Sequence, residues 1–333
     1  MEPRTSAVNT LVDQYGRVVR DLRISITPRC NYRCFYCDPL GEGSLEPQNT
    51  VSIKDVANVI EAASNLGLSS VRFTGGEPLL HKGLAKMISH AKHVVGIKDV
   101  AITTNASLLA RRLPELLEAG LDRVNISLDA VTPEVFNTAT QGGDIEQVWR
   151  GIEAVERAGL EPVKLNAVIV RDINETEITS LAELTREKPY HVRFIEYMHL
   201  NNAEPEAWQN SFISGKEARV MIEQEFGPLS PVTNDPSAPA RLFCIPGWSG
   251  AIGFINPISE PFCGACSRMR LTSDGKIRPC LMTDREIDAR EALNNGNPIE
   301  ALQDLFLVAA HRKVASGVIT PVHRPRTMIA IGG

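Results

Sequence analysis

Two groups of cysteines in this chain of 333 residues each place three thiols within a short stretch of sequence. The first group, Cys30, Cys34 and Cys37, has the spacing C-x3-C-x2-C. Three thiolates on one loop are enough to hold three irons of a four-iron cluster, which leaves the fourth iron open to a ligand. A structural zinc loop is the alternative, but zinc takes four ligands and no fourth Cys or His lies nearby in the sequence. The first group therefore predicts an iron–sulfur cluster with one open iron.

The second group, Cys263, Cys266 and Cys280, has the spacing C-x2-C-x13-C and again lacks an obvious fourth thiolate. Cys244 lies about 20 residues upstream in a stretch flanked by prolines, and we interpret it as a spare or buried thiol. Zinc is a stronger alternative here than in the first group, because C-x2-C is a common half of a zinc site. We predict that the second group also holds an iron–sulfur cluster with an open iron.

Two arginines, Arg268 and Arg270, follow the second cysteine group on a segment with strand character. Alternate residues of a strand point to the same side, so both guanidinium groups face one way. Arginine forks match the oxygens of a phosphate. The pair predicts a site for a phosphorylated substrate beside the second cluster, and a solvated charged surface is the alternative.

The segment Phe73–Pro78 reads Phe-Thr-Gly-Gly-Glu-Pro and follows the second predicted strand. Its glycines, Gly76 among them, let the backbone approach a ligand closely, and Glu77 or a backbone carbonyl offers an acceptor for an amine. Alone, such a sequence would be a plain turn. Together with Tyr36, an aromatic residue before the third cysteine, it resembles the motif by which the radical S-adenosylmethionine (SAM) superfamily binds the SAM amine.

These residues sit on an alternation of strands and helices. Two apolar sets recur at helical spacing, namely Ile53, Val56, Ile60 and Ala63, and Ile145, Val148, Ile152 and Val155. The predicted strands are Leu22–Thr27, Ser70–Thr74, Val100–Thr103, Arg123–Leu128, Val163–Val170 and Val192–Glu196. Six strand–helix repeats imply a parallel sheet, and six are too few for a full barrel of eight. We therefore predict an α/β fold, a partial (βα)6 TIM-like barrel of the radical SAM type, with ligands beyond the carboxyl ends of the strands.

The texture changes after residue 200, where prolines punctuate a loop-rich stretch. We predict two units, a barrel over residues 1–200 and a C-terminal extension over 201–333 that closes the open side of the barrel. The extension is expected to hold the second cysteine group, two short strand-like pieces and helices near Ile287–Asn294 and Pro298–Lys313.

The bulk composition excludes some classes of protein. A formal charge of −5 gives no general reason to expect nucleic acid or an anionic membrane as a partner. No apolar run approaches the roughly 20 residues that span a bilayer. The segment Met1–Asn9 lacks the apolar stretch of a signal peptide. We expect a cytoplasmic protein, and in a reducing compartment clustered cysteines indicate metal binding before disulfides.

Taken together, the motifs resemble those of the GTP 3′,8-cyclase family of molybdenum cofactor biosynthesis over almost the whole chain. The segments that carry this resemblance, besides both cysteine groups, are Leu11–Arg17, Asp21–Ser25, Arg193–Met198, Cys263–Leu271 and Gly332–Gly333. The resemblance implies two 4Fe-4S clusters and SAM as cofactors. It also implies that a 5′-deoxyadenosyl radical converts GTP to (8S)-3′,8-cyclo-7,8-dihydroguanosine 5′-triphosphate.

The resemblance further implies roles for individual residues. SAM contacts fall on Tyr36, Gly76, Glu77, Ser127 and Met198. GTP contacts fall on Arg23, Arg72, Thr103, Lys164, Arg268 and Arg270. The terminal Gly332 and Gly333 are expected inside the barrel with a part in catalysis, because residues without side chains fit where a Cβ would clash.

Partners also follow from the resemblance alone: a reductant protein such as flavodoxin or ferredoxin, a downstream cyclic pyranopterin monophosphate synthase, and a second copy in a homodimer. Three positions depart from the family pattern, and none is an expected metal ligand. Pro28 and Asp38 stand where an acidic residue and Met are common, and Ala106 replaces a usual glycine. The alternatives that stay open are a peptide-modifying radical SAM enzyme and an iron–sulfur electron carrier.

Overall fold

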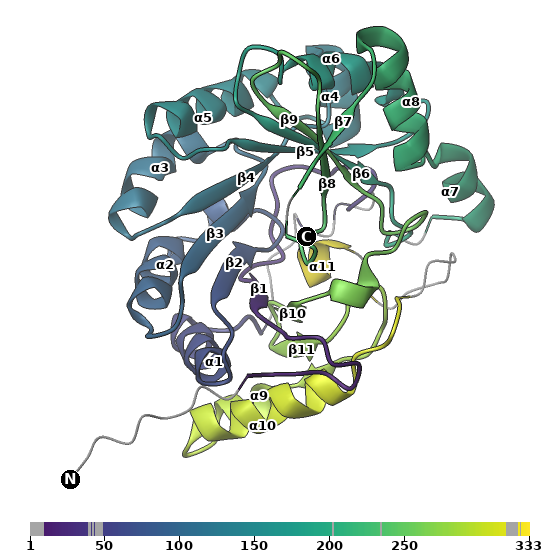
Figure 1. Ribbon diagram of the computed structural model, residues 1–333. Helices are drawn as coiled ribbons and strands as arrows, with labels where there is room; N and C mark the ends of the chain where they lie inside the picture. The colour runs from purple at the N-terminus through teal and green to yellow at the C-terminus, as the bar shows by residue number, and fades with distance from the viewer. Residues whose placement is uncertain are drawn as a thin grey trace.

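The computed structural model of the protein is built around one twelve-stranded sheet. It describes residues 10–38, 41, 43, 49–201, 203–233, 235–317, 326 and 328–333. The strands run in the order β12-β11-β10-β1-β2-β3-β4-β5-β6-β9-β8-β7, and Figure 1 looks down the curved sheet with helices around its outer side. The order keeps the first six strands together, as the sequence predicts.

The six strand–helix repeats are present, and each predicted strand is found within two residues of its expected ends. The strands of the repeats are β1 (Asp21–Ser25), β2 (Ser70–Thr74), β3 (Asp99–Thr104), β4 (Arg123–Ser127), β5 (Lys164–Ile169) and β6 (His191–Glu196). The helices between these strands are α1 (Ile53–Asn65), α2 (Leu84–His93), α3 (Leu109–Glu118), α4 (Pro133–Thr140), α5 (Ile145–Arg157) and α6 (Ile178–Glu183), with both α4 and α5 between β4 and β5. Helix α7 (Pro205–Ser211) follows β6. All five pairings between these strands are parallel.

The C-terminal region extends this run at both edges. Strand β9 (Ala251–Ile255) pairs in parallel with β6, and β10 (Arg268–Leu271) pairs in parallel with β1. Eight adjacent strands are therefore parallel. Antiparallel strands flank them, β8 (Arg241–Cys244) and β7 (Ser230–Val232) beyond β9, and β11 (Lys276–Arg278) and β12 (Ile287–Asp288) beyond β10. The extension thus borders the open side of the partial barrel.

The C-terminal region is more regular than its prolines indicated. Helices α7 (Pro205–Ser211) and α8 (Gly215–Phe226) occupy part of the stretch predicted to be loop. Pro205 is the first residue of α7, a position where the missing N–H costs no hydrogen bond. The helix predicted to start at Ile287 is wrong at its beginning, because Ile287 belongs to β12 and α9 covers Arg290–Leu293.

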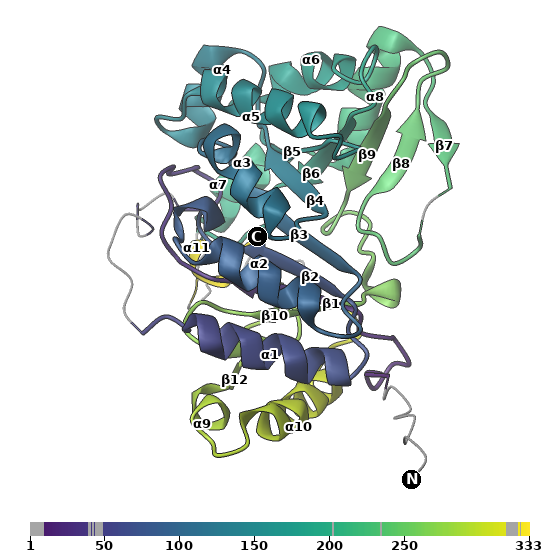
Figure 2. The same ribbon diagram turned by 90° about the vertical axis from the view of Figure 1, so that its left-hand side faces the viewer.

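The helices bury the apolar faces that the periodicity predicts. In α5 all four predicted residues are buried, whereas in α1 the first one, Ile53, is exposed. Ser52 caps α1 through a reciprocal pair of hydrogen bonds with Asp55. Helix α10 (Pro298–His311) lies alongside α1 at the lower side of both Figure 1 and Figure 2. Across the described residues, every helix is too short or too polar for a bilayer span.

Candidate active site

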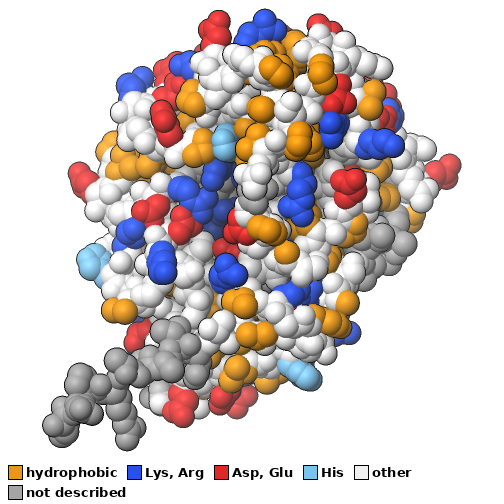
Figure 3. Space-filling view, in the orientation of Figure 1, with side chains coloured by type: hydrophobic (Ala, Val, Ile, Leu, Met, Phe, Trp, Pro, Cys, Tyr) orange, Lys and Arg blue, Asp and Glu red, His pale blue; other side chains and the backbone are white. Residues whose placement is uncertain are grey.

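The inner face of the parallel strands is polar and strongly basic. Arg23 of β1 lies in register with Arg72 of β2 on one side and with Arg270 of β10 on the other. Lys and Arg side chains gather around the middle of the face shown in Figure 3, over the mouth of the barrel. A row of cations inside a barrel is costly unless an anion offsets it, so the lumen is suited to a polyanionic ligand.

One cavity of about 310 Å³ opens on this inner face, and both cysteine groups line it. The predicted SAM residues on its wall are Tyr36, Gly76, Ser127 and Met198. The predicted GTP residues on its wall are Arg23, Arg72, Thr103, Arg268 and Arg270. The fold therefore brings together cysteines that lie more than 200 positions apart in the chain.

The loop of the first cysteine group is fixed by the glycines that follow β2. The N–H of Gly76 donates to the carbonyl of Thr27 at 2.7 Å, and the N–H of Glu77 donates to the carbonyl of Arg29 at 2.7 Å. A Cβ on Gly76 would lie 2.2 Å from the oxygen of Arg29, so only glycine fits. Close backbone crossing is thus the local reason for this glycine.

Glu77 has a different place from the one predicted. Its carboxylate accepts hydrogen bonds from the N–H groups of Leu79 and Asn105 and from the hydroxyl of Thr104, at 2.7 to 2.9 Å. The side chain is buried and is not part of the cavity wall. This geometry argues against a direct contact between its carboxylate and SAM and gives Glu77 a positioning role between β2 and β3.

The first cysteine group lies in a desolvated and acidic setting. Burial, helped by the charges of Glu77 and Asp38, raises the pKa of Cys30 to about 12. The pKa of Cys34 is raised by burial and then by the charge of Asp129. Asp129 accepts a hydrogen bond from the hydroxyl of Tyr36 at 2.8 Å, and burial raises the pKa of Asp129 to about 6.

The second cysteine group has cations beside it. The ammonium group of Lys313, a buried residue, donates to the carbonyls of Arg268 and Pro279 at 2.8 and 3.1 Å and lies 3.8 Å from the sulfur of Cys266. Burial acts to raise the pKa of Cys266, but the charges of Arg268 and Lys313 outweigh it and lower this pKa to about 7. Burial raises the pKa of Cys280.

The N-terminal motif Leu11–Arg17 supports the second cysteine group. The guanidinium of Arg17 is held by Asp13 at 2.6 Å and donates to the carbonyl of Cys263 at 2.7 Å. It also reaches the carbonyls of Val314 and Ala315. A segment at the start of the chain therefore holds the backbone of a thiol far along the sequence, a link that spacing alone does not show.

The arginines of the cavity are left with unused hydrogen-bonding capacity. Within the described part of the chain, no carboxylate forms an ion pair with Arg23, Arg72, Arg193, Arg268 or Arg270. The Nε atoms of Arg72 and Arg193 are buried and have no hydrogen-bond partner. Burial lowers the pKa of Arg72 to about 10 and that of Arg193 to about 9, with neighbouring cations adding to the effect.

Lys164 differs from the other predicted GTP residues because it is not part of the cavity wall. It is the first residue of β5 and lies in register with Asn125 and His191. Burial and the charge of Arg123 lower the pKa of Lys164 to about 8. It belongs to a basic group at the amino ends of the strands, and its contact with a triphosphate stays a prediction.

The C-terminal tail reaches the same cavity. Gly332 follows α11 (Met328–Ile331), and its carbonyl accepts a hydrogen bond from Arg270 at 2.7 Å. A Cβ on Gly332 would lie 2.9 Å from Ser25 Cβ, and its φ of +84° also favours glycine. The expectation that any Cβ clashes is wrong for Gly333, which lines the cavity but has open space around its Cα.

Some cavity residues received no role from the sequence. Arg193, Asn166 and Asp129 all line the wall. Alternation along a strand is a signal that would have found Asn166, which follows the predicted site residue Lys164 by two positions. Ala106, where the family pattern has glycine, adopts a left-handed backbone with φ 61°.

Comparison with known proteins places these features in a family. The Radical SAM superfamily pattern matches residues 24–185, and the Molybdenum Cofactor Synthesis C pattern matches residues 190–317. A GTP 3′,8-cyclase of Alkaliphilus oremlandii is 42% identical, covering 96% of this chain and 99% of the relative. A GTP 3′,8-cyclase of Thermodesulfovibrio yellowstonii is 39% identical over the same shares.

The chain belongs to the GTP 3′,8-cyclase family. Two solved structures have a fold similar to that of this protein. Streptococcus suis SuiB bound to S-adenosylmethionine is similar with a TM-score of 0.58 and 15% identity, over 87% of this chain and 69% of that one. The structure named native anSMEcpe with bound AdoMet is similar with a TM-score of 0.54 and 15% identity, over 86% and 84%. At this identity the likeness shows the radical SAM fold alone.

Proposed function

We propose that this protein converts GTP to (8S)-3′,8-cyclo-7,8-dihydroguanosine 5′-triphosphate, the first step of molybdenum cofactor biosynthesis. The observation that carries the proposal is the joining of three features in one cavity: two cysteine groups, a row of arginines that pair with no carboxylate among the described residues, and the C-terminal glycines. Sequence identity of about 40% to named cyclases over nearly the full chain supports the same activity.

The two cysteine groups fit iron–sulfur clusters by their donor chemistry. Cys30, Cys34 and Cys37 would hold the first 4Fe-4S cluster, and the second group, Cys263, Cys266 and Cys280, would hold the other. When bound, the first cluster supplies the electron that cleaves SAM, and the second supplies an iron position for the substrate base. All six thiols line the cavity, and all are free of disulfides.

The residues around the first group would position SAM. Tyr36 is fixed by its hydrogen bond to Asp129, and Asp129 also accepts the N–H of Val168 at 2.9 Å. This places the third cysteine of the loop against the carboxyl ends of β4 and β5. Gly76, Ser127 and Met198 line the wall nearby and would complete the SAM contacts.

The arginines would bind the triphosphate. Arg23, Arg72 and Arg270 share a register row, and the unpaired Nε of Arg72 is a buried donor that a phosphate oxygen would satisfy. Thr103 would add a hydroxyl to the wall. Arg268 lies between the second cysteine group and this row, with its guanidinium 4.8 Å from the ring centroid of Phe262. A triphosphate bound here would place the rest of the nucleotide between the two clusters.

The assignment includes a division of labour between the predicted units. Residues 1–200 would carry SAM cleavage, and residues 201–333 would carry substrate binding and the tail. A flavodoxin or ferredoxin would deliver the electron, a cyclic pyranopterin monophosphate synthase would take the product, and the enzyme would work in the cytoplasm as a homodimer. The family supports these partners by resemblance.

Product identification tests the proposal. Anaerobically reconstituted protein should consume GTP with SAM and dithionite and give 5′-deoxyadenosine and the cyclic nucleotide, identified by mass spectrometry. SAM cleavage without GTP conversion would point to a peptide-modifying enzyme. If SAM is not cleaved although both clusters are loaded, the alternative of an iron–sulfur electron carrier is favoured.

The two terminal glycines give a graded prediction. Gly332→Ala should lower GTP-dependent turnover sharply, because its Cβ would meet Ser25 and its φ is left-handed. Gly333→Ala should cost less, since the added methyl group has open space. Deletion of both should lower formation of 5′-deoxyadenosine with iron content unchanged. Turnover normalised to iron measures the order, and equal turnover of all variants would contradict a role for the tail.

A further inference from the structure

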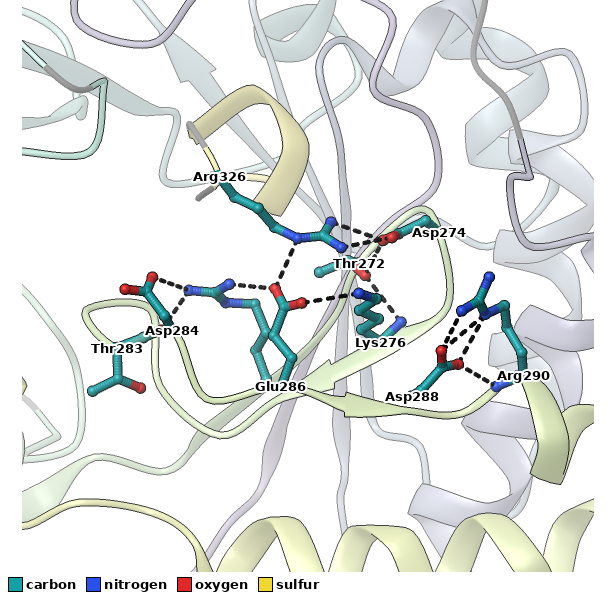
Figure 4. A network of polar contacts seen from close by, with 10 residues as sticks. Thr272, Asp274, Lys276, Thr283, Asp284, Glu286, Asp288, Arg290 and Arg326 are labelled. Carbon is teal, nitrogen blue, oxygen red and sulfur yellow. Dashed lines mark hydrogen bonds and ion pairs between the residues drawn. The ribbon is translucent and has the colours of Figure 1, made fainter. Parts of the chain in front are cut away.

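An ionic cluster outside the cavity holds the chain just before the tail. The guanidinium of Arg326 contacts both carboxylate oxygens of Asp274, at 3.0 and 2.7 Å, and its Nε lies 3.1 Å from Glu286. Figure 4 shows Arg326 reaching down from the segment before α11 to both carboxylates. A bidentate pair to one carboxylate with a third contact to another fixes both position and orientation.

The carboxylates of this cluster are themselves held in place. Glu286 also pairs with Arg278, a fully buried residue, and lies 3.5 Å from the ammonium group of Lys276. The hydroxyl of Thr272 donates to Asp274 at 2.6 Å. Arg326 therefore docks onto a pre-formed pair of anions on the β10–β11–β12 unit.

The same unit also touches the far end of the tail. Arg270 of β10 donates to the carbonyl of Gly332, and Ile329 and Ile331 between the two contacts are buried. Arg278 ends β11 two positions before Cys280. One structural unit thus holds the base of the tail, the tip of the tail and a thiol of the second cysteine group.

We propose that Arg326, bound between Asp274 and Glu286, is a positioning residue that sets where Gly332 and Gly333 lie in the cavity. The inference rests on the proposed function for its activity readout, but the docking itself does not. Without the bidentate contact, the contacts that the described residues still make with the tail are apolar burial and the hydrogen bond from Arg270, and the tip of the tail samples positions away from the cavity wall. Misplacement by about 1 Å costs an enzyme up to about 100-fold in rate.

The chain offers a matched control on the same unit. Arg290 contacts Asp288 through its Nε at 2.9 and 3.0 Å, but this pair is exposed and turned away from the tail. Arg290→Gln removes a comparable ion pair without touching Arg326. Full-length Arg326→Gln and Arg290→Gln enzymes, both reconstituted, are compared with the wild type for iron content, kcat, GTP dissociation constant and amide hydrogen exchange of the C-terminal peptide.

Arg326→Gln should lower kcat by about 10- to 100-fold with GTP affinity and iron unchanged, and only the C-terminal peptide should exchange faster. Arg290→Gln should behave as the wild type. The proposal is overturned if Arg326→Gln matches the wild type, or if exchange rises throughout β10–β12 and GTP affinity falls as well. If Arg326→Gln loses iron, Arg326→Lys takes its place in the test, and the same measurements are compared with those of the wild type. If the wild type fails to convert GTP while Arg326→Gln still shows faster exchange of the C-terminal peptide alone, the proposed function is refuted and the docking role of Arg326 is kept.

Discussion

The two cysteine groups share a three-thiol pattern and line one cavity, but their electrostatic surroundings are opposite. The first group has carboxylates as neighbours, among them Asp38 and Asp129, and burial raises the pKa of its thiols. The second group has Lys313 and Arg268 close to Cys266 and the basic row beyond. Nearby cations stabilise added negative charge and nearby anions oppose it. The first group is therefore suited to a cluster that gives up an electron readily, and the second to one that sits beside an anionic substrate.

The largest expected effect comes from removing the first cysteine group. Replacing Cys30, Cys34 and Cys37 by Ala should abolish formation of 5′-deoxyadenosine and reduce iron from about eight to about four per chain. Iron analysis and chromatography after anaerobic reconstitution measure both. Stoichiometric zinc in the anaerobically purified wild type would show that at least one cysteine group does not hold an iron–sulfur cluster.

Removing one thiol of the second group should separate the two sites. Cys263→Ala is expected to abolish cyclisation of GTP while SAM binding, followed by equilibrium dialysis, survives. The reason is that the predicted SAM residues on the cavity wall lie at or beyond the carboxyl ends of the barrel strands, on the side of the other group. GTP conversion at the normal rate by this variant would show that the second group has no part in substrate binding.

The cationic side of the cavity can be tested without touching a thiol. Arg268→Ala should weaken GTP binding by at least about tenfold, because a charge-assisted hydrogen bond contributes about 1.5–3 kcal/mol. The family resemblance counts Lys164 among the GTP contacts, but its place off the cavity wall predicts a smaller loss of GTP affinity for Lys164→Ala. Calorimetry on reconstituted variants ranks the two. Equal losses would move the phosphates towards the amino ends of the strands.

The smallest effect is a shift in thiol reactivity of the apoprotein. Cys266, with its pKa lowered to about 7, should react with iodoacetamide at a rate that rises through pH 7 and then levels off. Cys30, with its pKa raised to about 12, should stay slow and keep rising to high pH. Lys313→Met should move the Cys266 midpoint upward. Asp38→Asn should lower the pKa of Cys30 by less than about one unit and so speed its reaction slightly. Peptide mapping measures each site, and equal profiles for both thiols would remove the electrostatic contrast.

Local sequence signals predicted the six barrel strands because apolar periodicity is a property of neighbouring residues. They did not predict that β9 and β10 pair in parallel with β6 and β1, since strand partners far apart leave no local mark. Proline content was misleading at α7, where Pro205 starts the helix. The residue types of the site were predictable, but whether a given side chain lines the cavity wall was not. Glu77 and Lys164 therefore lie off the wall that their family roles implied.

The link between Asp13, Arg17 and the second cysteine group shows the same limit. Its residues belong to a motif noticed in the sequence, but the function of the motif needs the carbonyl of Cys263 beside it. Lys313 left no signal either, because a lysine near a helix end is usually solvated. Buried cations with sulfur as neighbour become visible only once the fold is known.

A single connection, residues 256–267, runs from β9 at one edge of the parallel strands to β10 at the other, and it carries Cys263 and Cys266. During synthesis this connection leaves the ribosome after all six barrel strands. The two cysteine groups should therefore receive their clusters in a fixed order. The first cysteine group becomes available to iron–sulfur donors before the connection from β9 to β10 has been made. Iron incorporation into ribosome-arrested chains of increasing length should rise in two steps, the first after β6 and the second only after Cys280 has emerged.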